Sequence, residues 1–401
     1  MFVLPLTFAL AADPSFTPEA QFRPRFEADT GRDFTAGAGD VAYITHRARL
    51  GGTLALGRVE ARIVFQDVRA WGEEADTRRD FDGDGIDLGI GTVTWRPHDN
   101  VSLVLGRQEL SVHRERLIAR ANWRQPGRRF DGARVLWQDD TRVAEVGAFL
   151  AVDSDAFLFD VQDQVVSTPG GDQTLWYARG GRETDTMTAQ AVVVVDSRQE
   201  VVDAEVLRIT PGAFVEGSSG IWRGHVEGYG QLGSVAGGTR SVQAGMLAVS
   251  GFVAPDVGSK PVIGLTYALL SGDGDPDDDT VTHFDTIRGA NHRHYGHQDI
   301  ATFFRGGAVG GQGLHDPFVT LAIQPVDAVT IQLDQHVFAP AAGDPWLALE
   351  PDLIARVALD DALGLAAGVS VWAQVSDPDL PVEQFAYVML DAVLKGPKLG
   401  G

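Results

Sequence analysis

Arginine is concentrated in one stretch of the chain, residues 103–137 (LVLGRQELSVHRERLIARANWRQPGRRFDGARVLW). Eight arginines stand there against three acidic residues, although the formal net charge of the protein is -22. Guanidinium groups this close repel one another unless they are paired, spread along a wall or facing an anion, and their planar fork matches a carboxylate. The stretch therefore indicates anion binding, and the alternative is a solvated arginine-rich loop.

A second candidate site is acidic. Asp80, Asp82 and Asp84 alternate in the stretch DFDGDGID, a spacing that lets carboxylates surround one hard cation such as calcium. Gly91 stands where an EF-hand needs a bidentate acid, so this is no EF-hand, and the alternative is a solvated acidic turn. The acidic run 273–279 has the same two interpretations. A transition-metal site could also be built in principle from clustered histidines, namely His283, His292, His294 and His297.

No pattern in the sequence indicates catalysis. The motifs G-x-S-x-G and H-E-x-x-H are absent, and so is a glycine-rich phosphate loop. No catalytic residue is expected, and the protein is not expected to be an enzyme. The absence of cysteine also excludes a disulfide scaffold and cysteine-ligated zinc.

The elements that must position the arginines are strands. Helix-period stretches are scarce and turn signals recur from end to end, which is typical of one large all-β domain. Alternation of apolar and polar residues predicts eighteen strands, at 22–30, 41–56, 58–71, 86–96, 100–109, 129–138, 141–152, 173–181, 184–195, 201–212, 219–231, 240–252, 260–271, 314–324, 328–338, 349–359, 362–373 and 385–394.

The connections between these strands alternate between short turns and long loops. This is the pattern of an outer-membrane barrel, whereas a soluble sandwich has no reason to follow it. Residues 298–305 look faintly strand-like, but counting them would break the alternation, so they are assigned to the long loop 272–313. The predicted fold is a single 18-stranded antiparallel transmembrane β-barrel. Its lumen is too wide for side chains to fill, and is therefore water-filled or plugged by loops.

The period of two also predicts which side chains face the lumen. In residues 42–50, for example, Ala48 and Leu50 oppose Arg47 and Arg49. The same rule leaves Arg107 ambiguous. It predicts a basic arc of Arg47, Arg49, Arg62, Arg134, Arg179, Arg223 and Arg356, facing an acidic arc that includes Asp203, Glu205, Asp334, Glu350 and Asp352. Either a polyanion follows the basic wall, or these charges pair with each other and brace the barrel.

The N-terminus predicts export. Residues 1–12 read as a signal peptide, because the apolar run 2–10 is followed by the small-residue site Ala9-Leu10-Ala11. The basic segment that usually precedes such a run is missing, so either the start lies upstream of Met1 or the signal is weak. Residues 13–401 form the barrel, and no later run of about eighteen apolar residues predicts a transmembrane helix.

Four segments resemble the bacterial alginate-export outer-membrane porin family: LGRQEL (105–110), NWRQPGRRFDGAR (122–134), SGDGDPDDDTVTHFDTIRG (271–289) and NHRHYGHQD (291–299). The resemblance covers nearly the whole mature chain. It implies an eighteen-stranded barrel with an electropositive pore, partly closed by loops, through which an anionic exopolysaccharide leaves the cell. By motif, Arg107, Arg128, Arg129 and Asp131 would lie near the constriction.

The resulting hypothesis is a passive channel in the outer membrane of a Gram-negative bacterium, with loops 110–128 and 272–313 gating the export of an alginate-like anionic polysaccharide. The alternatives are a general or substrate-selective porin for small solutes and a soluble periplasmic carbohydrate-binding β-protein. Expected partners are outer-membrane lipid, the polysaccharide and periplasmic export proteins, with no nucleic acid. The protein is expected to be a monomer that needs no cofactor. The one possible exception is a calcium ion in an extracellular loop, with Asp80, Asp82 and Asp84 as the candidate ligands.

Overall fold

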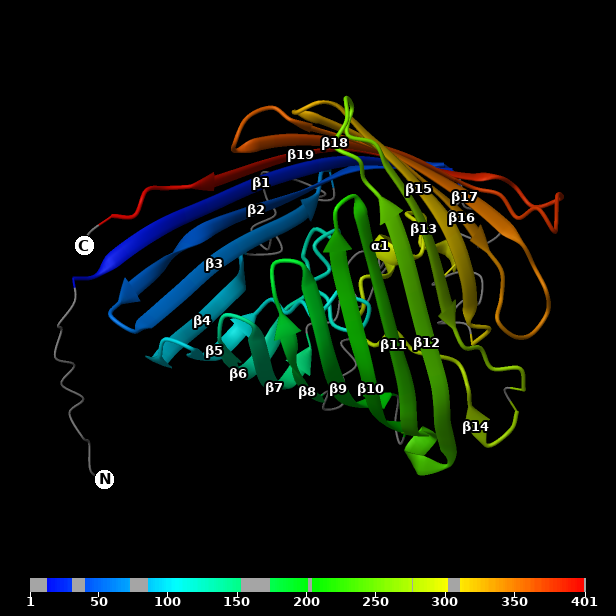
Figure 1. Ribbon diagram of the computed structural model, residues 1–401, viewed down its shortest axis with the longest axis horizontal. Helices are drawn as coiled ribbons and strands as arrows, with labels where there is room; N and C mark the ends of the chain where they lie inside the picture. Colours follow the sequence, from blue (N-terminus) through cyan, green and yellow to red (C-terminus); the bar gives the residue numbers. More distant parts are fainter. Residues whose placement is uncertain are drawn as a thin grey trace.

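The computed structural model describes residues 13–30, 40–72, 86–152, 174–200, 204–275, 277–301 and 311–399. Long strands dominate these residues (Figure 1). They are β1 (Ser15–Asp29), β2 (Val41–Leu56), β3 (Val59–Ala70), β4 (Asp87–His98), β5 (Val101–Gln108), β6 (Phe130–Gln138), β7 (Arg142–Val152), β8 (Thr174–Glu183), β9 (Met187–Glu200), β10 (Ala204–Ser219), β11 (Trp222–Val235), β12 (Arg240–Val253), β13 (Val262–Leu270), β14 (Thr280–Val281), β15 (Leu314–Val326), β16 (Val329–Phe338), β17 (Ala348–Ala358), β18 (Leu363–Trp372) and β19 (Glu383–Lys395). Among the described residues the helical elements are short, namely η1 (Ala236–Gly238), α1 (Asn291–His294) and a π-helical turn at residues 300–301. In the described part of the chain, no helix is long and apolar enough to cross a membrane.

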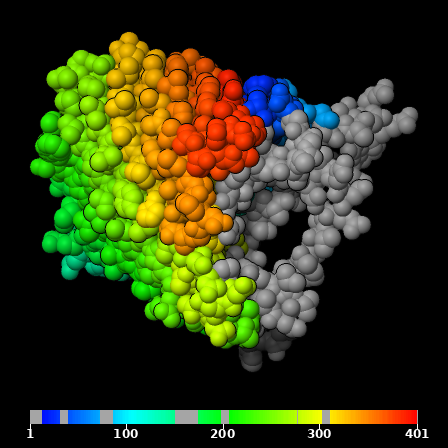
Figure 2. Space-filling view, turned by 90° about the vertical axis from the view of Figure 1, so that its right-hand side faces the viewer, coloured from blue at the N-terminus to red at the C-terminus, as the bar shows by residue number. Residues whose placement is uncertain are grey.

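The sheet closes on itself. Consecutive long strands pair antiparallel, and β1 pairs with β2 on one side and with β19 on the other, from Glu19 opposite Lys395 to Asp29 opposite Phe385. Figure 2 shows the C-terminal part of the chain (red) directly beside the N-terminal part (blue). The two-residue β14 pairs parallel to β12 within a loop and is not part of the ring. The ring is a closed barrel of eighteen antiparallel strands, as the alternation predicted.

Strand positions were predicted more accurately than strand ends. The two largest differences are at β1, which begins at Ser15 instead of residue 22, and at β10, which ends at Ser219 instead of residue 212. Pro18 breaks the apparent alternation, yet residues 15–21 continue the ladder opposite the long β2, with Ser15 opposite Ala55. Residues 298–301 contain no strand, which agrees with their assignment to a loop, and 302–305 lie outside the described residues.

The outside of the barrel is apolar and its inside is polar. On β5 and β6, Leu105 is 64% exposed and Val135 is 40% exposed, and on β13 Leu265 is 62% exposed, whereas the alternate position Gln108 is buried. Exposed aliphatic and aromatic side chains in one outward row per strand are what lipid requires of a barrel. Burial of polar side chains on the opposite row means that the bore is filled by other parts of the chain.

Two loops fill the bore. We call residues 109–129, between β5 and β6, the arginine loop, and residues 282–301, between β14 and β15, the histidine loop. They are joined by backbone hydrogen bonds, including Ala119 N–H to Arg288 O at 2.9 Å and Ala290 N–H to Glu115 O at 2.8 Å. A fully buried apolar cluster inside the ring includes Leu110, Ile118, Phe284, Tyr295 and Ile300 from these loops. The lumen is therefore narrowed by the chain's own loops, and Figure 1 shows α1 within the ring.

Three tyrosines lock neighbouring strands inside the barrel. Tyr177, Tyr229 and Tyr387 lie directly opposite Gly147, Gly212 and Gly368 in the strand register. An added Cβ would lie 2.5, 2.1 and 2.3 Å from the respective ring. Each ring therefore occupies the space beside a glycine where a Cβ would stand, and the pairing of these strands requires glycine there.

Candidate functional site: an arginine cluster inside the barrel

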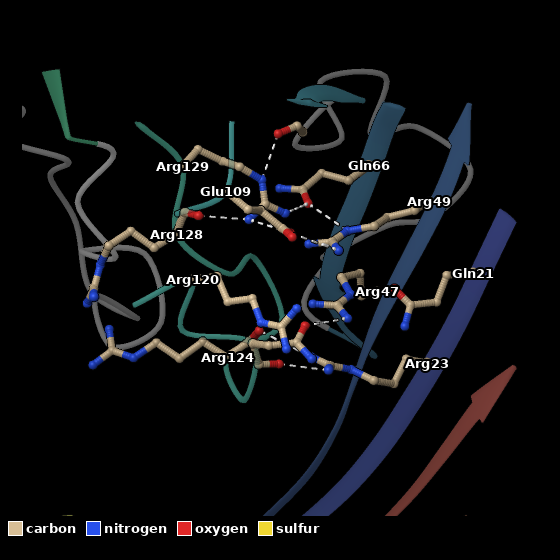
Figure 3. A network of polar contacts seen from close by, with 12 residues as sticks. Gln21, Arg23, Arg47, Arg49, Gln66, Glu109, Arg120, Arg124, Arg128 and Arg129 are labelled. Carbon is tan, nitrogen blue, oxygen red and sulfur yellow. Dashed lines mark hydrogen bonds and ion pairs between the residues drawn. The ribbon is translucent and has the colours of Figure 1, made fainter. Parts of the chain in front are cut away.

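Four arginines converge on the inner wall where it meets the arginine loop (Figure 3). Arg23 on β1 lies directly opposite Arg47 on β2 in the strand register, Arg49 follows on β2, and Arg129 ends the arginine loop just before β6. These residues alternate with outward apolar ones such as Phe22 and Leu50, so the strand period places their guanidinium groups inside. We call Arg23, Arg47, Arg49 and Arg129 the arginine cluster.

Arg23 and Arg47 are buried and are held by neutral oxygens. Arg23 donates Nε to Gln125 Oε1 (3.0 Å), Nη1 to Asn122 O (2.8 Å) and Nη2 to Arg124 O (3.1 Å). Arg47 donates Nη2 to Asn122 Oδ1 (3.1 Å), and its buried Nε has no partner. Within the described residues neither side chain forms an ion pair, although they are only 2% and 1% exposed. The guanidinium groups of Arg23 and Arg47 are therefore buried in the wall with no carboxylate of the described residues in contact.

Arg49 and Arg129 share one carboxylate. Glu109 Oε1 lies 3.5 Å from Arg49 Nη1 and 3.1 Å from Arg129 Nη1. Arg129 also donates Nε to Gly89 O at 2.6 Å, and both arginines reach Gln66 Oε1. The buried Nη2 of Arg49 has no partner among the described residues. The arginine cluster consequently keeps an excess of positive charge beside the loop that narrows the bore.

The arginine loop is tied to the far wall by two ion pairs. Arg116 Nε lies 2.6 Å from Glu227 Oε1 on β11, and both side chains are fully buried. Arg114 Nη1 lies 2.6 Å from Glu216 Oε2 on β10, where both groups are partly exposed. Because β10 and β11 are distant from β5 and β6 in the ring, these pairs stretch the arginine loop across the bore.

Aromatic contacts join the two loops. Trp123 stacks on His292 with ring centroids 4.2 Å apart, and the guanidinium carbon of Arg25 lies over the Trp123 ring, 4.1 Å from its centroid. His113 stacks on Phe214 of the far wall at 4.8 Å. Burial, with the nearby Arg179, lowers the pKa of His113 to about 4, so this ring is neutral at neutral pH. The loops thus form one packed constriction.

The remaining predicted arginines of the inner wall fall into separate places. Arg62 is held by Glu19 in a bidentate pair of 2.7 and 2.8 Å. Arg134 and Arg179 share Glu145, at 2.9 and 2.6 Å. Arg223 and Arg356 are exposed inside the barrel on other strands. Some arginines are thus paired with acids and brace the wall, whereas others have no acidic partner among the described residues and could attract a polyanion.

Arg107 is a correction. It shares the outward face of Leu105, and it forms a bidentate pair with Asp131 (2.9 and 2.8 Å) on the same face of β6. A lone arginine there would be costly, and the acid explains why it is tolerated. Arg128 also has a structural position, since its Nη1 donates to the carbonyl oxygen of Arg288 in the histidine loop.

The acidic arc does not face the basic one. Glu350 and Asp352 lie on β17, which is separated from β1 only by β18 and β19, so the acidic wall adjoins the basic wall. Their carboxylates accept hydrogen bonds from Gln298 N–H (2.8 Å) and His297 N–H (3.2 Å) and thereby hold the histidine loop. Asp334 on β16 accepts a hydrogen bond from Thr320. Asp203 and the side chain of Glu205 lie outside the described residues.

The predicted metal sites receive no geometric support from the described residues. Asp80, Asp82 and Asp84 lie outside the part of the chain that the structure describes. Among the residues it does describe, no three or more His, Asp or Glu side chains are grouped as metal ligands, and this includes the four clustered histidines. His292, for example, bonds Asp299 at 3.0 Å.

Sequence reasoning missed Arg23 and Arg25 on β1. The signal was present, because Arg23 and Arg25 alternate with Phe22, Pro24 and Phe26. Arg25 pairs with Glu27 at 2.7 Å and donates to Trp123 O at 2.6 Å, so it orients the arginine loop. The contact of the loop with β1 could not be read from the sequence, because about one hundred residues separate the partners.

A closed barrel of eighteen strands with an apolar exterior and a loop-narrowed polar bore defines the class of outer-membrane channels. The alginate export family matches residues 16–344, and the chain belongs to that family. No curated protein matches the chain. The protein is accordingly an outer-membrane protein of a Gram-negative bacterium, which overturns the soluble periplasmic alternative.

Solved barrels share the fold at low identity. OccAB1 of Acinetobacter baumannii is similar with a TM-score of 0.64 and 14% identity, covering 95% of this chain and 96% of that one. The outer membrane protein opdK of Pseudomonas aeruginosa gives 0.61 and 12%, covering 95% and 99%. A BenF-like porin from Pseudomonas fluorescens Pf-5 gives 0.59 and 11%, covering 94% and 99%. At these identities the likeness shows the fold.

Proposed function

We propose that this outer-membrane channel lets an acidic, alginate-like polysaccharide leave the cell. The observation that carries the proposal is the pair Arg23 and Arg47, two buried guanidinium groups bonded to amide and carbonyl oxygens. A passing carboxylate can replace such a neutral acceptor with a charge-assisted hydrogen bond. The attraction is spread over several arginines, so that a chain can enter and still leave.

The proposal needs no covalent chemistry. The arginine loop and the histidine loop would set the width of the passage, and their displacement would open it. The ring closes within one chain, which supports a monomeric channel. Periplasmic export proteins would deliver the polymer to the rim that carries the short turns.

A second candidate is a porin for small acidic solutes. It is favoured by the packing of both loops across the bore, with Ile118, Phe284 and Tyr295 fully buried between them. The same arginine cluster would serve a monomeric uronate or another small carboxylate. The two candidates differ in the size of the anion that passes.

Planar-bilayer recordings test both candidates. The purified protein is expected to prefer anions in a salt gradient, and the triple variant R23Q/R47Q/R49Q is expected to lose that preference. The matched control R58Q/R142Q/R182Q removes the same charge from the short-turn rim, where Arg58 and Arg142 pair with Asp99 and Asp139. Equal selectivity of the triple variant and wild type would refute the proposed role of the arginine cluster.

Polymer length separates the candidates. A polyuronate engages several arginines at once, so per sugar it should block current at a far lower concentration than the monomer does. Block by the monomer alone, with none by the polymer, would favour the small-solute porin. A neutral glucan of the same length serves as the control for size.

A further inference from the structure

A side cavity of about 410 Å³ lies between the inner wall of β2–β6 and the arginine loop. Its volume is within the range of small-molecule sites. The wall is made by inward positions of consecutive strands, and the roof is made by residues 109–111 with Arg120. The strands around the cavity are already braced by ion pairs, such as those of Arg62 with Glu19 and of Arg134 with Glu145.

The cavity lies toward the short turns. Thr53 is three residues before the end of β2, Glu60 is the second residue of β3, and Thr94 is four residues before the end of β4. The arginine cluster lies on the other side, with Arg49 farther from that rim along β2. Since short turns face the periplasm in such barrels, the cavity lies in the periplasmic half of the barrel.

Strand register arranges the polar groups of the cavity in rows. Thr53 lies opposite Arg62, which lies opposite Thr92. One step nearer the turns, Glu60 lies opposite Thr94. Neighbours in such a row are about 5 Å apart. Among the described residues, the hydroxyl groups of Thr53 on β2 and of Thr92 and Thr94 on β4 have no hydrogen-bond partner. Three hydroxyls on the two sides of β3 therefore line the hollow and are available to a ligand.

The arginines of the cavity are oriented but not covered. Glu19 takes Nε and Nη2 of Arg62, which leaves Nη1 available, and Glu145 takes Nη1 of Arg134. Arg120 is 51% exposed and lies 3.5 Å from Glu115. The two acids of the lining are already engaged, Glu60 by Arg96 at 2.8 Å and Glu109 by Arg129. A ligand therefore meets guanidinium donors whose direction is fixed.

Part of the cavity lining is apolar. Ile90, Val104 and Leu110 contribute aliphatic surface among the polar groups. Hydroxyl partners, guanidinium donors and an aliphatic surface are together what an acidic sugar ring needs, since it has hydroxyls, one carboxylate and C–H faces. A phosphate or a simple anion would leave the threonines and the aliphatic surface unused.

We propose that the side cavity is an entry subsite that binds one uronate unit of a saccharide on the periplasmic side of the arginine cluster. This rests on the proposed function in so far as a substrate enters from that side. The arginines are balanced by nearby acids, so binding is weak and reversible. Weak binding at successive places is what conduction requires.

The test uses the full-length protein in planar bilayers and a trimeric oligouronate as the probe. The oligouronate is expected to block at lower concentration from the short-turn side than from the long-loop side. The variant T53V/T92V removes two hydroxyls with little change in shape, and it should raise the blocking concentration roughly tenfold. The matched control T330V removes an inward threonine opposite Arg356, away from the cavity, and should not.

Two further variants complete the test. T53S/T92S keeps the hydroxyls, so the oligouronate should block it at the same concentration as wild type. This result would separate the loss of hydrogen bonds from a change in packing. R62Q/R134Q should remove the preference for the oligouronate over a neutral trisaccharide. Block that is equal from both sides and unchanged in T53V/T92V would overturn the subsite. If the subsite fails in this way but R23Q/R47Q/R49Q still abolishes anion selectivity, the proposed function stands without the subsite. If anion selectivity does not depend on the arginine cluster but T53V/T92V weakens block from the short-turn side, the subsite stands without the proposed function.

Discussion

Arg116 and Glu227 form the most enclosed ion pair that links the arginine loop to the far wall. Their charged atoms are 2.6 Å apart, and Tyr229 adds a hydrogen bond to the second oxygen of Glu227 at 3.0 Å. Burial of two charges is costly, so such a pair adds little net stability, but loss of one member leaves a bare charge in a place without water. Its contribution is to fix where the loop lies.

Replacement of Glu227 by glutamine is expected to weaken the docking of the arginine loop by roughly 3–5 kcal/mol, because Arg116 stays buried without its carboxylate. Single-channel recordings should then show larger and noisier conductance. The matched variant is E216Q, since Arg114 and Glu216 are 33% and 45% exposed and such pairs contribute about 1 kcal/mol or less. Identical recordings for E227Q and E216Q would contradict this account.

Pairs of strands depend on the tyrosines that lie on glycines. Gly368 on β18 and Tyr387 on β19 are register partners, and the ring occupies the space where a Cβ would stand. On the same strand, Gly364 has no atom nearer than Val357 O at 3.8 Å from its added Cβ. The ring of Tyr387 therefore requires glycine at position 368, whereas position 364 has room for a side chain.

The variant G368A is expected to lower the stability of the barrel by about 1–3 kcal/mol, because the ring of Tyr387 must move. G364A should be nearly neutral. Urea titration, followed by the gel mobility of the folded barrel, measures the difference. A double-mutant cycle with Y387A should show that the cost of the alanine vanishes once the ring is gone, and a cost that persists would show a different cause.

Alternation along each strand predicted both the elements and the side of the wall on which Arg47 and Arg62 lie. It failed where the wall is irregular or where a contact is long-range. Arg107 follows Gly106, whose φ is +117°, near the end of β5, and its ion pair with Asp131 across to β6 was not predicted. The contacts of Arg116 with Glu227 and of Arg128 with Arg288 join residues more than one hundred positions apart, and no local pattern encodes them.

The whole barrel depends on the contrast between its two faces. Leu105 is 64% exposed on the outer face, whereas Thr94 lines the cavity on the inner face. L105R is expected to reduce folding into lipid vesicles by up to about 2–4 kcal/mol, with the full effect if the residue lies at the midplane. T94R should fold normally because its charge reaches the polar bore. Equal folding yields would argue against the assigned faces.

The seam between β1 and β19 joins the first and the last strand of the ring. Until residues 383–395 have been synthesised, β1 and β18 each present a bare row of N–H and C=O groups, which is a template for pairing with other chains. The nascent protein must therefore be kept unpaired until its last strand exists. Biogenesis is all-or-none: a chain that stops short of β19 cannot make a smaller version of this pore, only an open ribbon prone to aggregation.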